Sequence, residues 1–333
     1  MVKHRAWIAV GVALAAGGVV ITDALYNPTG ATDLDQLWHA ARALRHGLDP
    51  YQVIGPGGAV FHWDWAFYYP LTAAVLLLPL SFLPLLAARV VFAMLSSGAL
   101  AYGLSAGPRW RLFVLASASF LWAAGSGQWS VLFTASLLIP WLAVIYPVKP
   151  NLAVAYVAGQ DRLRTAWLVG WAALVLVSVV IGGWWVPDWL AALGTAPHFR
   201  PYVFHIGGPL LLLAVLRWRQ REARLLLAMS VVPMTTMIYE TLPLLLIPAT
   251  RRECLLLVVL ANVASAVQLT LVHAPTEAEY IWRYGDITLW LVYVPALVMI
   301  LRRANEGAVP VWAERLTSRL PGWLRGRAPI ETA

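Results

Sequence analysis

Long apolar stretches separated by short polar clusters make up most of this chain. A helix needs about 20 residues to cross the hydrocarbon core of a bilayer, so the longest stretch can cross twice. The apolar stretches are residues 6–22, 65–88, 90–108, 112–148, 165–187, 201–216, 225–239, 241–250, 255–276 and 287–301. The pattern predicts an all-α integral membrane protein with about 10 to 12 transmembrane helices.

Residues 23–65 break this pattern, because they mix charged and aromatic residues with glycine and proline. Within them, residues 33–46 show helical spacing with two distinct faces. The apolar face comprises Leu34, Leu37, Trp38, Ala41 and Leu44, and the polar face comprises Asp35, His39, Arg42 and Arg45. The spacing predicts an amphipathic helix lying along the membrane surface, capped by Thr32 and ended by Gly47.

The positions of the basic residues predict the orientation of the chain. Hydrophobic residues make up 60% of the sequence and charged residues only 12%, with a net charge of +8. Basic pairs and groups at residues 3–5, 162–164, 217–224, 251–252 and 302–303 are typical of cytoplasmic ends, whereas residues 23–65, 184–200 and 273–286 are predicted to be external. Arg109 and Arg111 fit neither side cleanly. We expect both termini in the cytoplasm and no nucleic-acid partner, although the chain is basic.

This organisation predicts one transmembrane domain over residues 1–303, with 23–65 as its external loop. Residues 304–333 form a basic cytoplasmic tail, in which residues 311–324 have the spacing of an amphipathic surface helix. The single cysteine, Cys254, excludes a disulfide within the chain and a cysteine metal site. The sequence has no phosphate-binding P-loop, no GxGxxG after a strand and no HExxH, and we expect no cofactor.

Two carboxylates at the start of the predicted surface helix are candidates for catalysis. Asp33 and Asp35 would lie at a boundary between lipid and water, where a carboxylate can take the proton of a hydroxyl group. The alternative is that both are acidic residues of a first helical turn, favoured there by the helix macrodipole. Residue type alone leaves both interpretations open.

Four motifs in the first half of the chain resemble those of glycosyltransferase family 87 in the GT-C superfamily. Residues 33–51 read DLDQLWHAARALRHGLDPY, and residues 67–80 read FYYPLTAAVLLLPL, where the family has a Tyr-Pro-Pro-Leu motif. Gly127-Gln128 opens an apolar helix, and Lys149-Pro150-Asn151 stands where the family has Lys-Pro-Gln. The four occur in the family order. The chain departs from the family in lacking the second proline after Tyr69 and in a compressed segment between Gln128 and Lys149.

The resemblance implies a GT-C fold and an inverting transfer of sugar from a polyprenyl-phosphate donor. The sugar is expected to be mannose, with arabinofuranose as the nearest alternative, and the acceptor a glycolipid or glycan outside the cytoplasm. Asp33 matches the family's catalytic aspartate by its distance from Trp38, with Asp35 as the fallback. Tyr69 and Gln128 fall within the matched motifs and are expected to contact substrate. A transporter or flippase of lipid-linked sugars is the alternative from another class of protein.

Other polar residues are candidates for the donor phosphate or the sugar. Lys149 lies inside an apolar stretch, where a cation is costly and usually functional, although it could also extend to an interface. His198, Arg200 and His205 flank the start of a predicted helix and could bind phosphate or anchor a loop at the headgroups. Substrate contacts are also predicted for His62, Trp63, Asp64, Tyr239 and Glu240. His62 and Asp64 could join Asp33 around a metal ion, but such pairs are common in polar loops and we expect no metal.

Overall fold

The computed structural model describes residues 2–196, 199–310, 314 and 321 and is mostly helical. It divides the chain into two compact units. Unit 1 comprises residues 1–108, 122–150 and 165–198, and unit 2 comprises residues 109–121, 151–164 and 199–333. The predicted amphipathic stretch at residues 311–324 falls largely outside the described residues.

Five helical segments in the described part of the chain are long and apolar enough to cross a membrane. They are Lys3–Tyr26, Leu85–Leu104, Thr165–Gly182, Arg251–Leu271 and Ala278–Leu301. This confirms the expected class, a mainly helical chain with membrane-spanning character. The count of about 10 to 12 crossings and the GT-C fold stay predictions, because the remaining apolar stretches form shorter helices.

Unit 1 is built around two long helices, and the predicted external loop lies between them in the sequence. Its elements are α1 (Val2–Tyr26), α2 (Asp33–Arg45), α3 (Pro50–Val53), β1 (Ile54–Gly55), β2 (Phe61–His62), α4 (Leu71–Leu76), η1 (Leu78–Phe82), α5 (Leu85–Leu104), α7 (Ser130–Ser136), η3 (Pro140–Val148), α9 (Thr165–Gly182) and α10 (Val186–Gly194). The two short strands pair in parallel, Ile54 with Phe61 and Gly55 with His62. Helix α6 (Ala118–Gly125) includes residues of both units.

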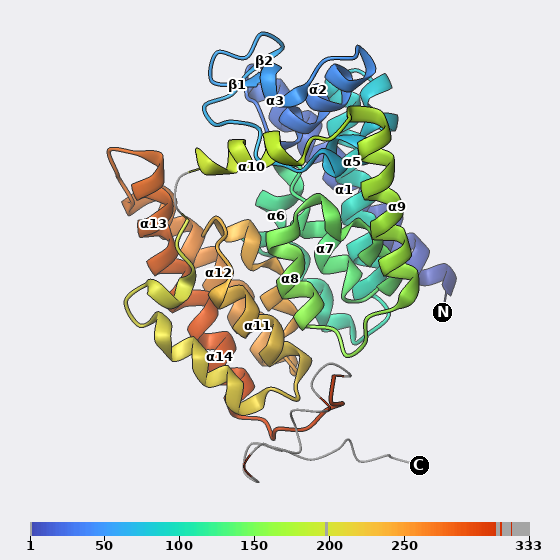
Figure 1. The fold of residues 1–333 in the computed structure, drawn as a ribbon. Coiled ribbons are helices and arrows are strands. Elements are labelled where there is room, and N and C mark those ends of the chain that lie inside the picture. The colour runs from blue at the N-terminus through green and yellow to red at the C-terminus, as the bar shows by residue number, and fades with distance from the viewer. Residues whose placement is uncertain (1, 197–198, 311–313, 315–320, 322–333) are drawn as a thin grey trace. The chain divides into compact units, whose positions relative to one another are not determined.

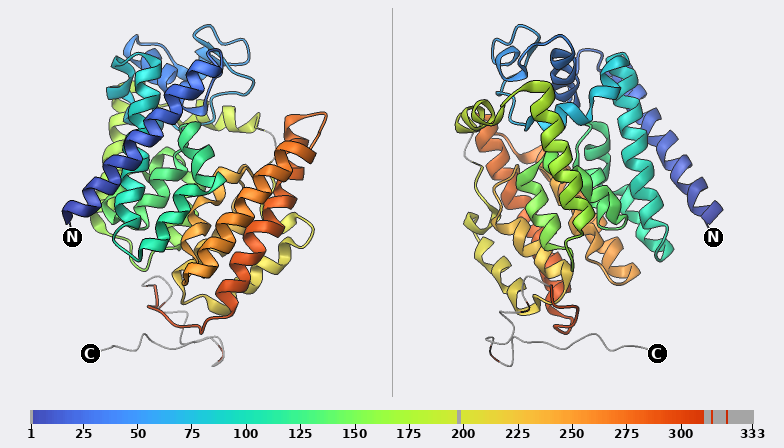
Figure 2. Two further views of the ribbon diagram at one scale, coloured as in Figure 1. Left: turned by 180° about the vertical axis from the view of Figure 1, so that it is seen from behind. Right: turned by 45° about the vertical axis from the view of Figure 1, so that its right-hand side comes forward.

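Helices α1 and α5 pack along each other in opposite directions (Figure 2). The Arg5 guanidinium, near the start of α1, lies 4.2 Å from the centre of the Tyr102 ring and donates to the Tyr102 carbonyl at 3.0 Å. Tyr102 is close to the end of α5, so the start of α1 and the end of α5 meet. Midway along, Gly17 lets α1 approach Val90 and Met94 of α5. The connecting segment therefore lies at the other end of this pair.

The structure corrects the sequence interpretation of residues 65–88. Their apolar stretch is long enough to cross a membrane, but it forms no continuous helix: α4 has six residues and η1 has five. Pro79 lies in η1 and Pro84 directly precedes α5, and proline interrupts helices because it lacks an N–H and restricts the preceding residue. Hydrophobicity alone indicates a crossing helix, whereas the prolines in the sequence indicate ends or kinks here. As a result, α1 and α5 are successive long helices.

Helix α10 packs against the same end of unit 1 as the segment between α1 and α5 (Figure 1). The Trp189 indole N–H donates to the Tyr68 carbonyl at 3.0 Å. At the turn after α9, the Trp185 indole donates to the Ser178 hydroxyl at 3.0 Å. Two regions that the charge pattern places on one side of the membrane, residues 23–65 and the described residues 184–196, thus lie at one end of unit 1.

Unit 2 holds most of the second half of the chain. Its elements are η2 (Arg109–Ala116), α8 (Pro150–Ala158), η4 (Tyr202–Phe204), η5 (Gly208–Arg217), α11 (Arg221–Val231), η6 (Ile238–Leu246), α12 (Arg251–Leu271), α13 (Glu277–Thr288), η7 (Leu289–Tyr293) and α14 (Val294–Leu301). Pro150, the first residue of α8, belongs to unit 1, and the first half of α6 belongs to unit 2. Basic side chains join its segments: Arg217 donates to the Leu301 carbonyl at 3.0 Å, and Arg224 pairs with Asp161 at 2.5 Å. Cys254 is buried and forms no disulfide, and its thiol donates to the Trp110 carbonyl at 3.7 Å.

Candidate functional site

The first turn of α2 positions the two candidate carboxylates. The Asp35 carboxylate accepts from the Thr32 backbone N–H at 2.8 Å and from the Thr32 hydroxyl at 3.0 Å, which stabilises the start of the helix. At the other end, Gly47 has φ +70°, a left-handed conformation that suits glycine and ends the helix. The predicted helix, its Thr32 start and its Gly47 end are confirmed.

The expected exposure of the polar face of α2 holds for Arg42 and Arg45 but is wrong for Asp35. Asp35, on the predicted polar face, is only 1% exposed, and Gln36, Ala40 and Ala43 are buried as well as the apolar face. The helix packs against α3, α4, α5 and η1, so protein rather than lipid or water covers most of its first turns. The amphipathic spacing identified the helix, but it did not show that several other elements would bury its first turns.

Arg89 on α5 is a residue of this site that sequence reasoning missed. Its guanidinium donates to the Asp35 carboxylate through Nε at 2.7 Å and through Nη2, which also donates to the Gly30 carbonyl at 2.9 Å. The pair is buried, with the Arg89 side chain 13% exposed and that of Asp35 1%. Arg89 is the lone cation between the apolar stretches 65–88 and 90–108, a position that indicates a partner or a function.

Asp33 contacts the Gly-Gln motif, although the two lie 95 residues apart in the sequence. The Gln128 amide donates to Asp33 Oδ2, and Gln36 donates to Asp33 Oδ1 at 3.5 Å. Gln128 is 1% exposed, whereas Asp33 is half-buried. Gly127 has φ +68°, and a Cβ there would lie 2.7 Å from Leu34 Cβ, so only glycine allows this approach. Two of the matched motifs therefore meet at the half-buried carboxylate.

Lys149 and Tyr69 lie on segments that converge on the same part of unit 1. The Tyr146 hydroxyl is 2.8 Å from that of Ser136, so η3 folds back along α7. Gln128 lies two residues before α7, and Lys149 directly follows η3. Thr72, three residues after Tyr69, donates to the Pro147 carbonyl at 2.7 Å, which ties α4 to the end of η3.

An aromatic stack joins α2 to the short strands. The His39 and Phe61 rings are stacked with centroids 4.4 Å apart, and Trp63 stacks on Phe61 at 5.8 Å. Burial lowers the pKa of His39, although Asp35 partly opposes this effect, so the ring is neutral at pH 7. Trp63 is half-buried beside two exposed neighbours, His62 and Asp64. A half-buried indole of this kind can stack on the apolar face of a sugar ring.

The structure does not assemble a metal site from His62, Asp64 and Asp33. The His62 and Asp64 side chains are 70% and 86% exposed and lie 3.9 Å apart. Within the described residues, no group of three histidine, cysteine or acidic side chains could hold a metal ion.

Two of the other predicted contacts of the donor phosphate, Arg200 and His205, lie in unit 2. His205 Nδ1 is 2.8 Å from Asp286 Oδ1, its side chain is fully buried, and its ring stacks on Trp282 at 3.6 Å. Arg200 is exposed, with its guanidinium 5.4 Å from the Trp282 ring centre. His205 therefore faces Asp286 and Trp282 rather than solvent. His198 lies outside the described residues.

Tyr239 and Glu240 also belong to unit 2. Glu240 lies in η6 and is only 1% exposed, whereas Tyr239 is half-buried. The structure thus distributes the predicted residues over both units. Unit 1 contains Asp33, Gln128, Lys149 and Tyr69.

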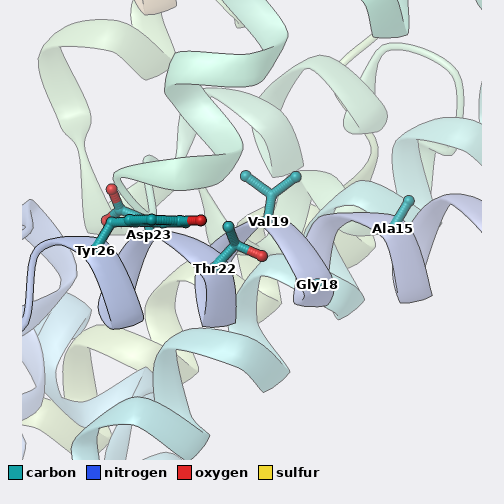
Figure 3. Close-up of a pocket in the computed structure, with 6 residues that line it drawn as sticks. All are labelled: Ala15, Gly18, Val19, Thr22, Asp23 and Tyr26. Atoms are coloured by element: carbon teal, nitrogen blue, oxygen red, sulfur yellow. The ribbon is translucent and has the colours of Figure 1, made fainter.

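A groove on the surface of unit 1 contains none of the predicted site residues. It runs along the exposed side of α1 (Figure 3) and is lined by Ala15, Gly18, Val19, Thr22, Asp23 and Tyr26. Because one helix supplies all of these side chains, the groove is a concave helix face rather than an enclosed site.

No protein-family model matches the chain, and no curated protein and no solved structure is significantly similar to it. Functional inference therefore rests on the residues themselves. Unit 1 offers a half-buried carboxylate with a fixed amide donor, and it also contains the half-buried Lys149. A carboxylate of this kind can take a proton from a hydroxyl group, and an ammonium group can stabilise a phosphate.

Proposed function

We propose that this chain is a membrane glycosyltransferase of the GT-C type. It transfers a sugar, mannose in our proposal, from a polyprenyl-phosphate donor to a glycolipid or glycan acceptor. The observation that carries the proposal is the contact between Asp33 and Gln128, because it joins two separate motifs that resemble glycosyltransferase family 87. The burial of Asp35 in its ion pair with Arg89 supports Asp33 as the base of the reaction, since Asp35 is only 1% exposed and Asp33 is half-buried.

The proposed reaction exchanges one bond at the anomeric carbon of the sugar. The acceptor oxygen forms the new bond to the anomeric carbon while its proton passes to the Asp33 carboxylate. The bond between the anomeric carbon and the phosphate oxygen breaks, and its electron pair leaves with polyprenyl phosphate. Lys149 stabilises the charge of the departing phosphate. Attack from the face opposite the phosphate inverts the anomeric configuration.

The positions of Arg5 and of the predicted external regions at opposite ends of unit 1 support a site on the external face. Arg5 lies at the end where α1 begins and α5 finishes, and residues 23–65 and 184–196 lie at the other end. Cationic residues favour the cytoplasmic side, so we place the N-terminus in the cytoplasm and Asp33 on the external face. In this orientation Arg109, which follows α5 in the chain, is cytoplasmic. This proposal resolves the ambiguity of Arg109 and Arg111.

The direct test is incubation of the purified protein with radiolabelled polyprenyl-phosphate mannose and a membrane lipid extract. We expect a new labelled glycolipid whose formation depends on the protein. Labelled polyprenyl-phosphate arabinofuranose, supplied in parallel, separates the two sugars. In sealed vesicles, movement of the donor between leaflets without a new glycolipid would favour a flippase and contradict the proposal.

A further inference from the structure

The orientation of the Gln128 amide is set by its partner. An ionised carboxylate has only acceptor atoms, so the amide must turn its NH₂ group toward Asp33. The amide oxygen, Oε1, then points away from this contact. Gln128 is 1% exposed, and Oε1 is a buried atom that accepts no hydrogen bond from the part of the chain that the structure describes.

An amide oxygen without a donor is costly in this environment. Burial removes it from water, and the loss is not offset unless a donor is found elsewhere. The same feature recurs at the next two residues, because the Trp129 indole N–H and the Ser130 hydroxyl are buried without a hydrogen-bond partner among the described residues. The start of α7 therefore carries polar atoms that its protein neighbours do not satisfy, beside the half-buried Asp33 carboxylate.

We propose that Gln128 selects acceptors that present two neighbouring hydroxyl groups. One hydroxyl donates to Asp33 and becomes the nucleophile, and the adjacent hydroxyl donates to Gln128 Oε1. Asp33 and the amide oxygen of its hydrogen-bonded partner form a pair of acceptors, which matches a diol of a sugar or polyol. A lone alcohol, such as a serine or threonine side chain, would satisfy only one of the two. This inference rests on the proposed glycosyltransferase function.

The role of Gln128 is thus to determine specificity, in addition to orienting Asp33. Its loss should change which acceptors are used, and not only how fast they react. Methionine is a suitable replacement because its side chain has a similar length and lacks both the NH₂ donor and the oxygen acceptor of the amide. Gln36→Met is the matched control, since Gln36 is also buried and also donates to Asp33, but its oxygen is not an unsatisfied buried atom.

The test compares octyl α-mannoside with its single-deoxy analogues as acceptors for polyprenyl-phosphate mannose. For the wild-type protein, removing the hydroxyl next to the attacked one should lower kcat/KM about tenfold or more. In Gln128→Met the ratio of kcat/KM between the mannoside and this deoxy analogue should shrink to about twofold. Gln36→Met should have a lower kcat/KM for both acceptors but the same ratio as the wild type. Equal use of the analogues by the wild type, or an unchanged ratio in Gln128→Met, would overturn the inference.

A binding measurement separates this inference from the proposed function. Tritiated octyl α-mannoside and its deoxy analogues are bound to the purified protein without donor. Discrimination that depends on Gln128, in a protein that transfers no sugar, would support the diol site and refute the transferase. Transfer of sugar to mannosides without such discrimination would support the transferase and refute the diol site.

Discussion

Arg89 and Asp35 form a buried ion pair that ties α5 to the first turn of α2. The same guanidinium binds the Gly30 carbonyl, so it also holds the segment that leads into the helix. Asp33 lies on this first turn of α2, and its hydrogen bond with Gln128 depends on the position of the turn. The ion pair is thus a structural support for the candidate base.

Removing Arg89 alone should destabilise the protein strongly. In Arg89→Leu the Asp35 carboxylate would stay buried without its cation, which typically costs about 3 to 5 kcal/mol in the free energy of unfolding. The double variant Arg89→Leu with Asp35→Leu should lose less than the sum of the single variants, because no charge remains buried. Denaturant unfolding in mixed micelles measures both. Additive losses would show that the two side chains are not coupled.

Gly127→Ala should disturb the contact between Asp33 and Gln128. An alanine there must adopt φ +68° and bring its Cβ within 2.7 Å of Leu34 Cβ, so we expect a cost of about 1 to 3 kcal/mol. Gly125→Ala is the control, because a Cβ at Gly125 would meet open space. A lower unfolding temperature and reduced transfer are expected for Gly127→Ala only. Equal behaviour of the two variants would argue against a constrained turn.

The buried His205 should make stability depend on pH. Burial lowers the pKa of His205 below its usual 6.5, and the hydrogen bond and charge of Asp286 oppose this only in part. The unfolded chain therefore takes up a proton before the folded protein does. Stability should be complete above about pH 6.5 and decline as the pH falls from there toward the folded pKa. Comparing unfolding temperatures at pH 7.5 and 5.5 tests this: the decline should be smaller in His205→Gln, and an equal decline would refute it.

Lys149→Ala should weaken binding of the donor. It removes a cation from a half-buried position where screening by water is reduced, so donor KM should rise about tenfold or more. Lys149→Arg keeps the charge and should recover much of the affinity. Donor titrations with polyprenyl-phosphate mannose measure the effect. An unchanged donor KM in Lys149→Ala would assign the phosphate to other residues.

The sequence predicted local features well where one signal dominated. Helix α2, its start at Thr32 and its end at Gly47 followed from spacing and capping residues. The six-residue α4 in place of a crossing helix was not predicted, because the prolines at 70, 79 and 84 mark ends or kinks without showing how short the helices between them are. Burial of Asp35 was also missed, since its partner Arg89 lies 54 residues away and no local pattern links them.

The candidate site was predicted only in part. The resemblance singled out Asp33 and Gln128, and the structure places them in contact. It could not indicate that Gln128 donates to the aspartate itself, because hydrogen-bond partners depend on tertiary packing. His205, chosen as an external basic residue, proved to be buried against Asp286 and Trp282, an arrangement determined by α13 rather than by its own neighbours in sequence.

The measurement that tests the central proposal most directly is sugar transfer by Asp33→Asn alongside Asp35→Asn. Asparagine keeps the size of the side chain but removes its basicity. Turnover from radiolabelled polyprenyl-phosphate mannose should fall about 100-fold or more in Asp33→Asn, while donor binding and the unfolding temperature stay near wild type. Asp35→Asn should instead lower the unfolding temperature, because its charge pairs with Arg89. Full turnover in a folded Asp33→Asn protein would contradict the assignment of Asp33 as the catalytic base.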